Sequence, residues 1–561
     1  MVVVIAEWIY MGIICFLIGY GSYQLLKKLW KTLPAFSLLS VMILGITVIT
    51  IYAELFSIVG KVGMAAHLIL LSAAVITGVC NRRKVCEYFC ARHIRISLWE
   101  AAFYCGLILF FAFFASRGEF HTDTNIYHAQ NIRIYEEYGL IKGMANLQLH
   151  YGYNSAYLAF AAIFSMKWLL PWSLHTTTGF ITALLSLDAC YHLKTFRQRK
   201  QHLSDAGYIA ILIYALVILV RSMSPATDFP TMFLSLYFIT AWLRAVEQKA
   251  TVVVYALLSV FAVFLGTMKL SAIAIAIAAV YPFCLFMKER KWKDILICIV
   301  LGVDVLLPYL IRNVLISGWL IYPFEKMDLF QVAWKVPVEY LIRDSNQIKV
   351  WARCLYDVTK VDLPLMEWLP VWWEGQARYE QYLFYACVIG GILALCNLFF
   401  KVCRKGKVNV PLLVLYLAII CSAGVWFFLA PFIRYGLSFL LVFPLIGIAC
   451  WYDAPKKGLY SLSSGILVFA LFLCLSPFID NYVTDAGVFL KHNVKEPYYL
   501  LQKDYDDAAT SGHQINGITI YSCDNGEINS YHYTPNTCYP FMLERSTLAG
   551  DSLKDGFVPI Y

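Results

Sequence analysis

The densest group of ionisable side chains lies in residues 119–135, Glu-Phe-His-Thr-Asp-Thr-Asn-Ile-Tyr-His-Ala-Gln-Asn-Ile-Arg-Ile-Tyr, directly after a long apolar run. Asp123 or Thr122 can cap a helix here, and on that helix Asp123, Tyr127 and Gln130 share one face at i, i+4 and i+7. This spacing predicts a carboxylate at the boundary between water and lipid, where it can accept a proton from a lipid-carried substrate. The alternative is that Asp123 only caps the helix and its aromatic neighbours are interfacial.

Four further charges lie at the same boundary, at the ends of apolar runs: Asp228, Lys269, Arg312 and Arg434. Ionisable groups beside membrane spans are costly and suggest function. The three cations predict an electropositive pocket for a phosphate or diphosphate, because arginine binds phosphate oxygens bidentately and lysine adds a compact charge. Two alternatives remain. Asp228 forms an ion pair with Lys269 or Arg434 that only fixes helix packing, or any one of the three cations, Arg312 above all, merely snorkels to the membrane surface.

The composition excludes a soluble globular enzyme. Of 561 residues, 60% are hydrophobic and 14% are charged, whereas soluble domains carry about 25% charged residues. Apolar runs of about 17–25 residues match the length that crosses a bilayer as a helix. We therefore expect an all-α polytopic membrane protein in the lipid bilayer. The net charge of +9 does not indicate nucleic-acid binding, since lysine and arginine gather in the cytoplasmic loops of such proteins.

We predict about 14 spans. The first has no basic leader or small-residue cleavage site, which favours a membrane anchor over a removable signal. Basic clusters occupy alternate loops, and the positive-inside rule makes these loops cytoplasmic and both termini extracytoplasmic. The clusters lie at residues 27–31, 82–84, 194–200, 288–293 and 401–407. The predicted spans are residues 4–26, 34–59, 62–80, 98–116, 174–193, 206–223, 229–243, 252–266, 270–287, 294–311, 381–400, 410–430, 432–452 and 459–479.

One apolar segment does not fit as a span. Counting residues 154–170 as a span would place the basic cluster at 194–200 outside, so we expect a helix that lies along the outer membrane surface. Three outer segments then remain: 117–172, 312–380 and 480–561. We divide the chain into N-terminal spans (1–97), a membrane core (98–479) and an extracytoplasmic C-terminal domain (480–561).

The C-terminal segment has the composition of a small folded domain. Residues 517–521 alternate as in a strand, and turn-forming residues follow at 524–526 and 535–536, which predicts a small α/β domain. Cys523 and Cys538 are its only cysteines. Outside the cytoplasm they can form a disulfide, and two separate thiols are the alternative. The remaining cysteines mostly lie in apolar runs, and no His/Cys spacing indicates zinc.

These motifs together resemble the GT-C class of membrane glycosyltransferases, and more specifically a bacterial family of uncharacterised GT-C-like membrane proteins. GT-C enzymes carry a catalytic carboxylate in an outer loop directly after a span. Here three spans precede the one that leads into that loop, whereas many GT-C enzymes place the loop after their first span. Thr124 also stands where a second acidic residue often follows, so donor type and metal use stay open. The resemblance is carried by Asp123-Thr-x-x-Tyr127-His128-x-Gln130-x-Ile-Arg133, Gly143-x-Ala145-Asn146-Leu147, Gly152-Tyr-Asn154-Ser155, Arg312-Asn313-x-x-x-Ser317-Gly318 and Cys523…Pro-x-x-Cys538.

The resemblance implies an inverting sugar transferase on the outer face of the bacterial cytoplasmic membrane. Its donor would be a sugar on a polyprenyl phosphate or diphosphate, and its acceptor a cell-envelope glycan or another envelope molecule. Asp123 would be the general base, and the three cations would stabilise the leaving phosphate. Sugar or acceptor would be bound by His121, Tyr127, His128, Gln130, Arg133 and Asn154.

Several points stay open at this level. A Mg²⁺ or Mn²⁺ ion held by Asp123 and Asp228 is one alternative, although two carboxylates so far apart in sequence make no ligand signature. A surface-polysaccharide polymerase or ligase shares the same general features. A transporter or flippase of lipid-linked glycans would show internal duplication and ionisable groups near the bilayer midplane, whereas the charges singled out above lie at the outer boundary.

Overall fold

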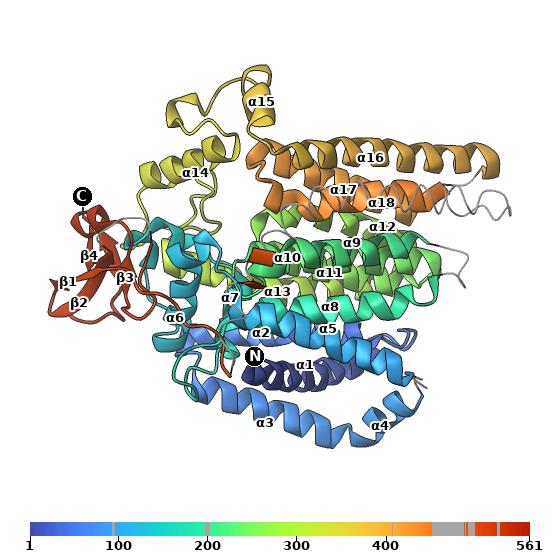
Figure 1. The fold of residues 1–561 in the computed structure, drawn as a ribbon, viewed down its shortest axis with the longest axis horizontal. Coiled ribbons are helices and arrows are strands. Elements are labelled where there is room, and N and C mark those ends of the chain that lie inside the picture. The colour runs from blue at the N-terminus through green and yellow to red at the C-terminus, as the bar shows by residue number, and fades with distance from the viewer. Residues whose placement is uncertain are drawn as a thin grey trace.

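Long apolar helices make up most of the molecule, and they lie side by side with their axes roughly aligned (Figure 1). The structure is a computed structural model and describes residues 1–91, 96–196, 202–406, 408–451, 487–488, 490–491, 500–523 and 528–560. Two small sheets lie at one end of the helix bundle, which we call the sheet end. Helix α4 (Arg82–Cys90), which carries a basic cluster, lies at the opposite end, the basic end.

The predicted spans up to residue 452 all coincide with helices. The last predicted span, 459–479, lies outside the described residues. The helices of the bundle are α1 (Val2–Leu29), α2 (Leu38–Val59), α3 (Met64–Cys80), α5 (Leu98–Arg117), α8 (Thr177–Leu193), α9 (Leu203–Val217), α10 (Asp228–Glu247), α11 (Val252–Met268), a 3-10 segment (Leu270–Ala279) continued by α12 (Val280–Lys288), α13 (Trp292–Ser317), α16 (Arg378–Lys405), α17 (Val410–Leu429) and α18 (Ile433–Trp451).

The structure supports a membrane protein with many spans. In the described part of the chain, nine helices are long and apolar enough to cross a bilayer, or ten if α3 and α4, bent by 72°, are one span. Helix α9 has only 15 residues, and α8 and α11 have 17 each, whereas a span typically has about 20 residues and at least about 17. The predicted total of about 14 spans therefore stays a prediction.

Glycine allows the first two helices to touch through their backbones. A Cβ atom on Gly19 of α1 would lie 1.9 Å from the Val41 carbonyl oxygen of α2, and one on Gly45 would lie 1.9 Å from the Cys15 carbonyl oxygen. Small residues at such crossings allow the close approach that drives helix association in membranes. This contact fixes α1 against α2, whose far end supports the outer segments.

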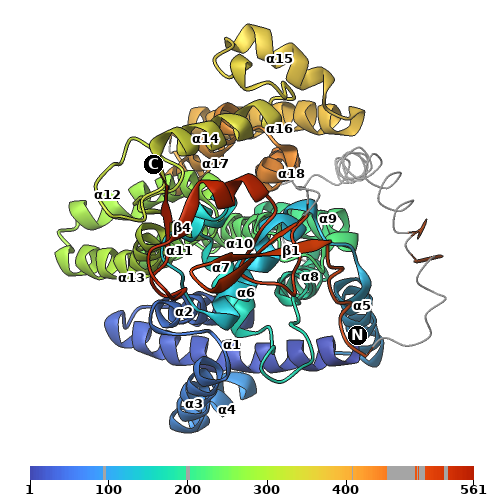
Figure 2. The same cartoon turned by 90° about the vertical axis from the view of Figure 1, so that its left-hand side faces the viewer.

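The described elements of the first two predicted outer segments and the sheets of the third lie at the sheet end, which Figure 2 shows from the front. The first contains a π-helix (Thr124–His128), α6 (Ala129–Glu137), two 3-10 turns (Met144–Asn146 and Leu149–Gly152) and α7 (Ala156–Ile163). The second contains α14 (Val338–Ala352), a 3-10 turn (Val358–Lys360) and α15 (Leu365–Glu374).

The predicted surface helix at 154–170 is wrong in length and position. Helix α7 has only eight residues, and all eight are buried inside the protein. It packs against α2 and α6, and the Ser155 hydroxyl donates to the Met268 carbonyl oxygen (2.6 Å). An apolar segment at the end of a bundle can bury itself against protein as well as against lipid, and the sequence does not distinguish the two.

The C-terminal segment folds into two small sheets. Strands β1 (Thr510–Ile515) and β2 (Ile518–Cys523) form a hairpin, β3 (Asn536–Thr537) pairs parallel to β2, and β4 (Ser546–Leu548) pairs with β5 (Phe557–Pro559). The hairpin turns at Asn516 and Gly517, whose φ angles of 50° and 78° are those that a two-residue turn of this kind requires. The predicted strand is confirmed as β2, and the predicted turn at 524–526 lies outside the described residues.

The helical part of the predicted α/β domain is limited. In residues 500–523 and 528–560 the only helical segment is a 3-10 turn, Pro540–Glu544. The side chains of Cys523 and Cys538 are both buried in this segment. The Ser530 backbone N–H donates to the Cys523 Sγ (3.2 Å). The predicted disulfide between the two cysteines stays a prediction.

Candidate functional site

Asp123 lies at the start of the outer segment, one turn after the end of α5. The alternative role as a helix cap is not what the structure shows, because the Asp123 side chain makes no cap hydrogen bond. Its Oδ2 atom instead accepts a hydrogen bond from Arg434 Nη2 (2.8 Å). The side chain is 21% exposed, so the carboxylate is accessible from the sheet end.

The helix that follows is wound differently from the one predicted. Residues Thr124–His128 form a π-helix, whose wider turn shifts every later side chain around the axis. Gln130 is consequently buried, and its Nε2 donates to the Asn125 and Asn529 carbonyl oxygens (3.1 and 3.3 Å). The predicted shared face of Asp123 and Gln130 is therefore wrong, although both residues lie in this segment.

Arg434, at the start of α18, connects most of the predicted charges. Its Nη2 donates to Asp123 and to the Tyr435 hydroxyl (3.0 Å), and its Nη1 lies 2.6 Å from His121 Nε2. Its Nε lies 3.3 Å from Asp228 Oδ2, but neither atom is aligned for a hydrogen bond, so this contact is an ion pair only. One guanidinium thus contacts both carboxylates of the predicted site.

Lys269 completes the group from the other side. It follows α11 in an extended conformation, its Nζ forms an ion pair with Asp228 Oδ1, and it lies 3.6 Å above the centre of the Tyr435 ring. The Asp228 side chain is only 2% exposed. The predicted ion pairing of Asp228 is confirmed with both cations, so any phosphate would have to bind beside these pairs.

We call Asp123, Asp228, Lys269, Arg434 and His121 the ion cluster. Its two carboxylates and two cations balance, so the cluster is formally neutral when His121 is uncharged. Burial lowers the pKa of His121 to about 4. Its ring nitrogens face two N–H donors, the Asp123 backbone on Nδ1 (3.1 Å) and Arg434 on Nε2. A neutral ring can accept from one of them through its single unprotonated nitrogen, whereas a protonated ring can accept from neither. The ring therefore stays uncharged at neutral pH.

Within the ion cluster, exposure separates two roles. Asp228 is buried, whereas the side chains of Asp123, Lys269 and Arg434 are 21%, 19% and 31% exposed. A buried carboxylate holds the two cations in place, and three partly exposed groups face outward. The cluster can therefore offer a base and two cations to one ligand.

Arg312 does not contact the ion cluster in any interaction that the structure shows. It is buried, its Nη1 donates to the Ser57 hydroxyl and its Nε to Asn154 Oδ1 (3.3 Å), and its guanidinium lies 4.0 Å above the Tyr135 ring. Asn154 in turn donates to the Tyr309 carbonyl oxygen (3.2 Å). Arg312 and Asn154 thus join α2, α13 and the outer segment, and their roles toward phosphate and sugar stay predictions.

The other predicted binding residues divide into accessible and internal ones. The Tyr127 hydroxyl makes no hydrogen bond to the described residues, and this ring is half-buried. His128 is 2% exposed and lies 3.5 Å from the Thr227 hydroxyl, and burial lowers its pKa to about 3. Arg133 forms ion pairs with Glu136 (3.7 Å) and Glu137 (3.1 Å). Only Tyr127 among these is free to meet a ligand directly.

The proposed metal ligands do not form an ion site as they stand. Asp123 and Asp228 both bind Arg434, which occupies the place between them. In the described part of the chain no group of three His, Cys, Asp or Glu side chains is suited to hold a metal. The arrangement fits a guanidinium and does not fit Mg²⁺ or Mn²⁺, so we derive no step through a metal.

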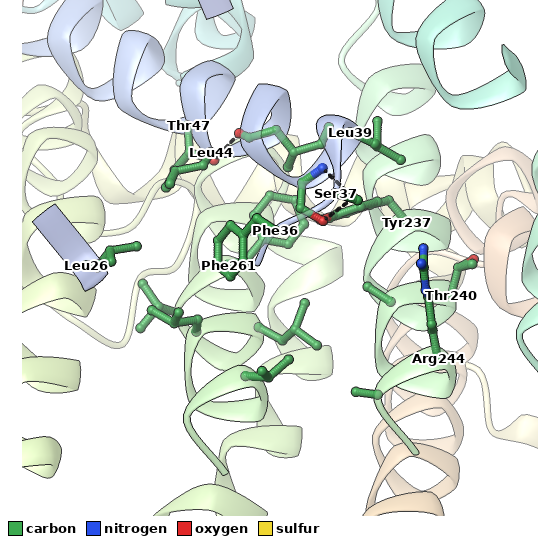
Figure 3. A pocket seen from close by; sticks show the side chains of 18 of the residues that line it. Leu26, Phe36, Ser37, Leu39, Leu44, Thr47, Tyr237, Thr240, Arg244 and Phe261 are labelled. Carbon is green, nitrogen blue, oxygen red and sulfur yellow. Dashed lines mark hydrogen bonds between the residues drawn. The ribbon is translucent and has the colours of Figure 1, made fainter. Parts of the chain in front are cut away.

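A cavity of about 540 Å³ lies in the bundle between α2, α10, α11 and α13 (Figure 3). Most of its lining is apolar, including Phe36 and Phe261, but Arg244, Asp188 and Asp304 also line it. Arg244 Nη1 lies 3.0 Å from His192 Nε2. Asp188 and Asp304 fall inside predicted spans, so the description of charges at the outer boundary missed ionisable groups within the bundle.

A comparison with protein families places this site in a recognised group of sequences. The family model described as "Domain of unknown function (DUF8201)" matches residues 1–441. The chain therefore belongs to this family. The matched region contains all five residues of the ion cluster and ends before the C-terminal sheets. No curated protein matches the chain.

Proposed function

We propose that this protein is a membrane glycosyltransferase that moves a sugar from a polyprenyl-phosphate-linked donor to an envelope acceptor on the outer face of the membrane. The observation that carries the proposal is the contact of Asp123 with Arg434, 311 residues apart, beside Lys269 at the sheet end. A base next to two cations is the arrangement that sugar displacement from a phosphate requires.

In the proposed reaction the acceptor hydroxyl attacks the anomeric carbon of the donor sugar. Its oxygen forms the new glycosidic bond while the bond from that carbon to the phosphate oxygen breaks. The proton moves to Asp123, and the electron pair leaves with the phosphate. Arg434 and Lys269 would stabilise the charge that develops on this oxygen, and Tyr127 would orient a sugar hydroxyl.

Arg434 positions Asp123 for the reaction. The hydrogen bond from its guanidinium fixes where the carboxylate points. Asp228, which is buried, keeps Arg434 and Lys269 on the same side of the cluster. Binding of a phosphate beside Arg434 would weaken its hold on Asp123 and leave the carboxylate free to meet the acceptor hydroxyl.

The test uses the full chain in lipid nanodiscs with a synthetic polyprenyl-phosphate sugar and envelope glycan acceptors. Removing the base by Asp123→Asn should lower the rate of transfer by about 10²–10⁴. The matched control is Glu119→Gln, an exposed carboxylate four residues earlier, which should leave the rate unchanged. Equal rates for wild type and Asp123→Asn would remove Asp123 from the reaction.

A transporter or flippase of lipid-linked glycans is the second candidate, and the cavity in Figure 3 favours it. Ionisable groups inside membrane helices mark substrate or ion pathways, and Asp304 lies near the middle of α13. The full chain in sealed lipid vesicles distinguishes the two functions. Movement of a fluorescent lipid-linked glycan across the membrane without sugar transfer would support transport and contradict the transferase.

A further inference from the structure

A second acidic group lies at the sheet end, apart from the ion cluster. Asp344 on α14 has a side chain that is only 5% exposed. Its Oδ2 accepts a hydrogen bond from the Tyr153 hydroxyl, and its Oδ1 lies 3.6 Å from His150 Nε2. Burial raises the pKa of Asp344. No pattern in the sequence indicates this group, because it joins two outer segments almost 200 residues apart.

Aromatic rings connect this group to the ion cluster. The His150 ring lies 5.3 Å from the Tyr127 ring, 6.0 Å from the Tyr153 ring and 5.9 Å from the Tyr539 ring. Burial raises the pKa of Tyr539, and the neighbouring Cys538 and then the charges of Asp344 and Asp123 add to the rise. Tyr539 thus lies beside His150, which in turn lies beside Asp344.

These rings are neither fully buried nor fully hydrogen-bonded. Tyr127, His150, Tyr153 and Tyr539 are all half-buried. The described residues offer no hydrogen-bond partner to the Tyr127 hydroxyl or to the buried His150 Nδ1, whereas the Tyr539 hydroxyl forms a hydrogen bond with the Cys538 thiol. Polar ring atoms without a protein partner can hydrogen-bond to water, and a ligand can take the place of that water.

We propose that Tyr127, His150, Tyr539 and Asp344 form the subsite for the acceptor, and that it binds an uncharged sugar ring. This inference rests on the proposed function. It places the acceptor between Asp344 and Asp123, so that one of its hydroxyls meets the base while the rest of the ring is held by the aromatic group.

The chemistry of the subsite selects this class of acceptor. A sugar ring presents apolar C–H faces, which pack on aromatic rings, and hydroxyls at its edge, which donate to a carboxylate and to imidazole. A charge-assisted hydrogen bond to Asp344 would be stronger than a neutral one. The carboxylate would repel an acidic sugar, which favours neutral sugars over uronic or sialic acids.

Kinetics with the full chain in nanodiscs test the subsite. The donor is the polyprenyl-phosphate sugar, and the acceptors are neutral disaccharides on a fluorescent alkyl chain. Asp344→Asn and Tyr539→Ala should each raise the acceptor KM at least 10-fold and leave the donor KM unchanged. Glu339→Gln, an exposed carboxylate on the same helix, should change neither. An unchanged acceptor KM, or an equal loss for the donor, would overturn the subsite.

A binding measurement separates this inference from the proposed function. If the wild type transfers no sugar, the proposed function fails, and saturation-transfer NMR with the same disaccharides then tests the subsite alone. Binding to wild type that is lost in Tyr539→Ala would support the subsite. Equal binding to both proteins, or none to either, would overturn it. Thermal unfolding of each variant shows whether it is folded, and half-buried Tyr539 is the variant least expected to perturb the core.

Discussion

At the scale of single residues, Asp228 decides the geometry of the ion cluster. It is nearly inaccessible and contacts two cations that come from different helices. Buried ion pairs contribute little net stability, but removal of one partner leaves an uncompensated charge. Asp228 therefore contributes little net stability, but its loss would leave two cations without their shared anion.

The substitution Asp228→Asn should lower the free energy of unfolding by about 3–5 kcal/mol, because Lys269 and Arg434 would then lie together without their shared anion. Thermal unfolding in detergent measures the loss. Adding Lys269→Met to this variant should restore part of it, since one unpaired charge is removed. Asp506→Asn is the control, because that side chain is 94% exposed. Equal stability of wild type and Asp228→Asn would contradict the anchoring role.

The sequence predicted which residues carry charge at the boundary but not which residues they meet. A charge at the end of an apolar run is visible because burying it is costly. Its partner is fixed by packing between distant segments, and Asp123 and Arg434 show this most clearly. Arg312 had the same signal in the sequence and is bound instead by Ser57 and Asn154. The π-helix that turns Gln130 inward had no signal.

At the scale of elements, the described residues of the C-terminal segment form one wall of the site. The Gln502 side chain accepts from the His175 backbone N–H (2.5 Å) and donates to the Ala115 and His175 carbonyl oxygens (2.9 and 3.0 Å). Tyr505 stacks on Phe120 with ring centres 4.0 Å apart. Phe120 directly precedes His121, so the C-terminal segment supports the loop that carries Asp123.

The substitution Gln502→Ala should loosen this attachment by about 2–3 kcal/mol, because it leaves buried backbone groups without partners. Limited proteolysis is the measurement, and the C-terminal segment should be cleaved about 30-fold faster or more than in wild type. Lys503→Ala, which removes a half-exposed side chain, should not change the cleavage rate. Unchanged cleavage of Gln502→Ala would show that the sheets are held by other contacts.

Helices were easier to predict than the elements that cover them. Thirteen predicted spans coincide with helices because a long apolar run can be read directly from a sequence. The short helix α7 was placed against lipid although it lies inside the protein. Hydropathy indicates that a segment is buried away from water, but it does not indicate whether the segment is buried in lipid or in protein.

At the scale of the whole molecule, buried histidines make the outer segments sensitive to acid. Burial lowers the pKa of His121 to about 4 and those of His128 and His175 to about 3. Burial raises the pKa of Glu136 to about 7 and also raises that of Asp344. The histidines and the two acids act in opposite directions as the pH falls.

As the pH falls from about 6.5 to 4.5, these three histidines take up protons in the unfolded chain and stay unprotonated in the folded chain. Each of these histidines should therefore lower the stability by up to about 1.4 kcal/mol per pH unit on acidification. Thermal unfolding in detergent from pH 7 to 5 measures the slope. His175→Gln should reduce the slope by about this amount, and an unchanged slope would contradict the assignment.

The orientation of the bundle decides whether the ion cluster can meet a donor in the outer leaflet. The basic clusters described at the ends of α1, α4 and α12 predict that the basic end is cytoplasmic, which puts the sheet end outside. Alkaline phosphatase needs disulfides and is active only in an oxidising compartment. Fused after residue 560 it should be active, and fused after Lys288 it should be inactive. Green fluorescent protein at the same positions is the reciprocal control. Fluorescence after residue 560 with an inactive phosphatase there would place Asp123 in the cytoplasm and exclude an outer-face transferase.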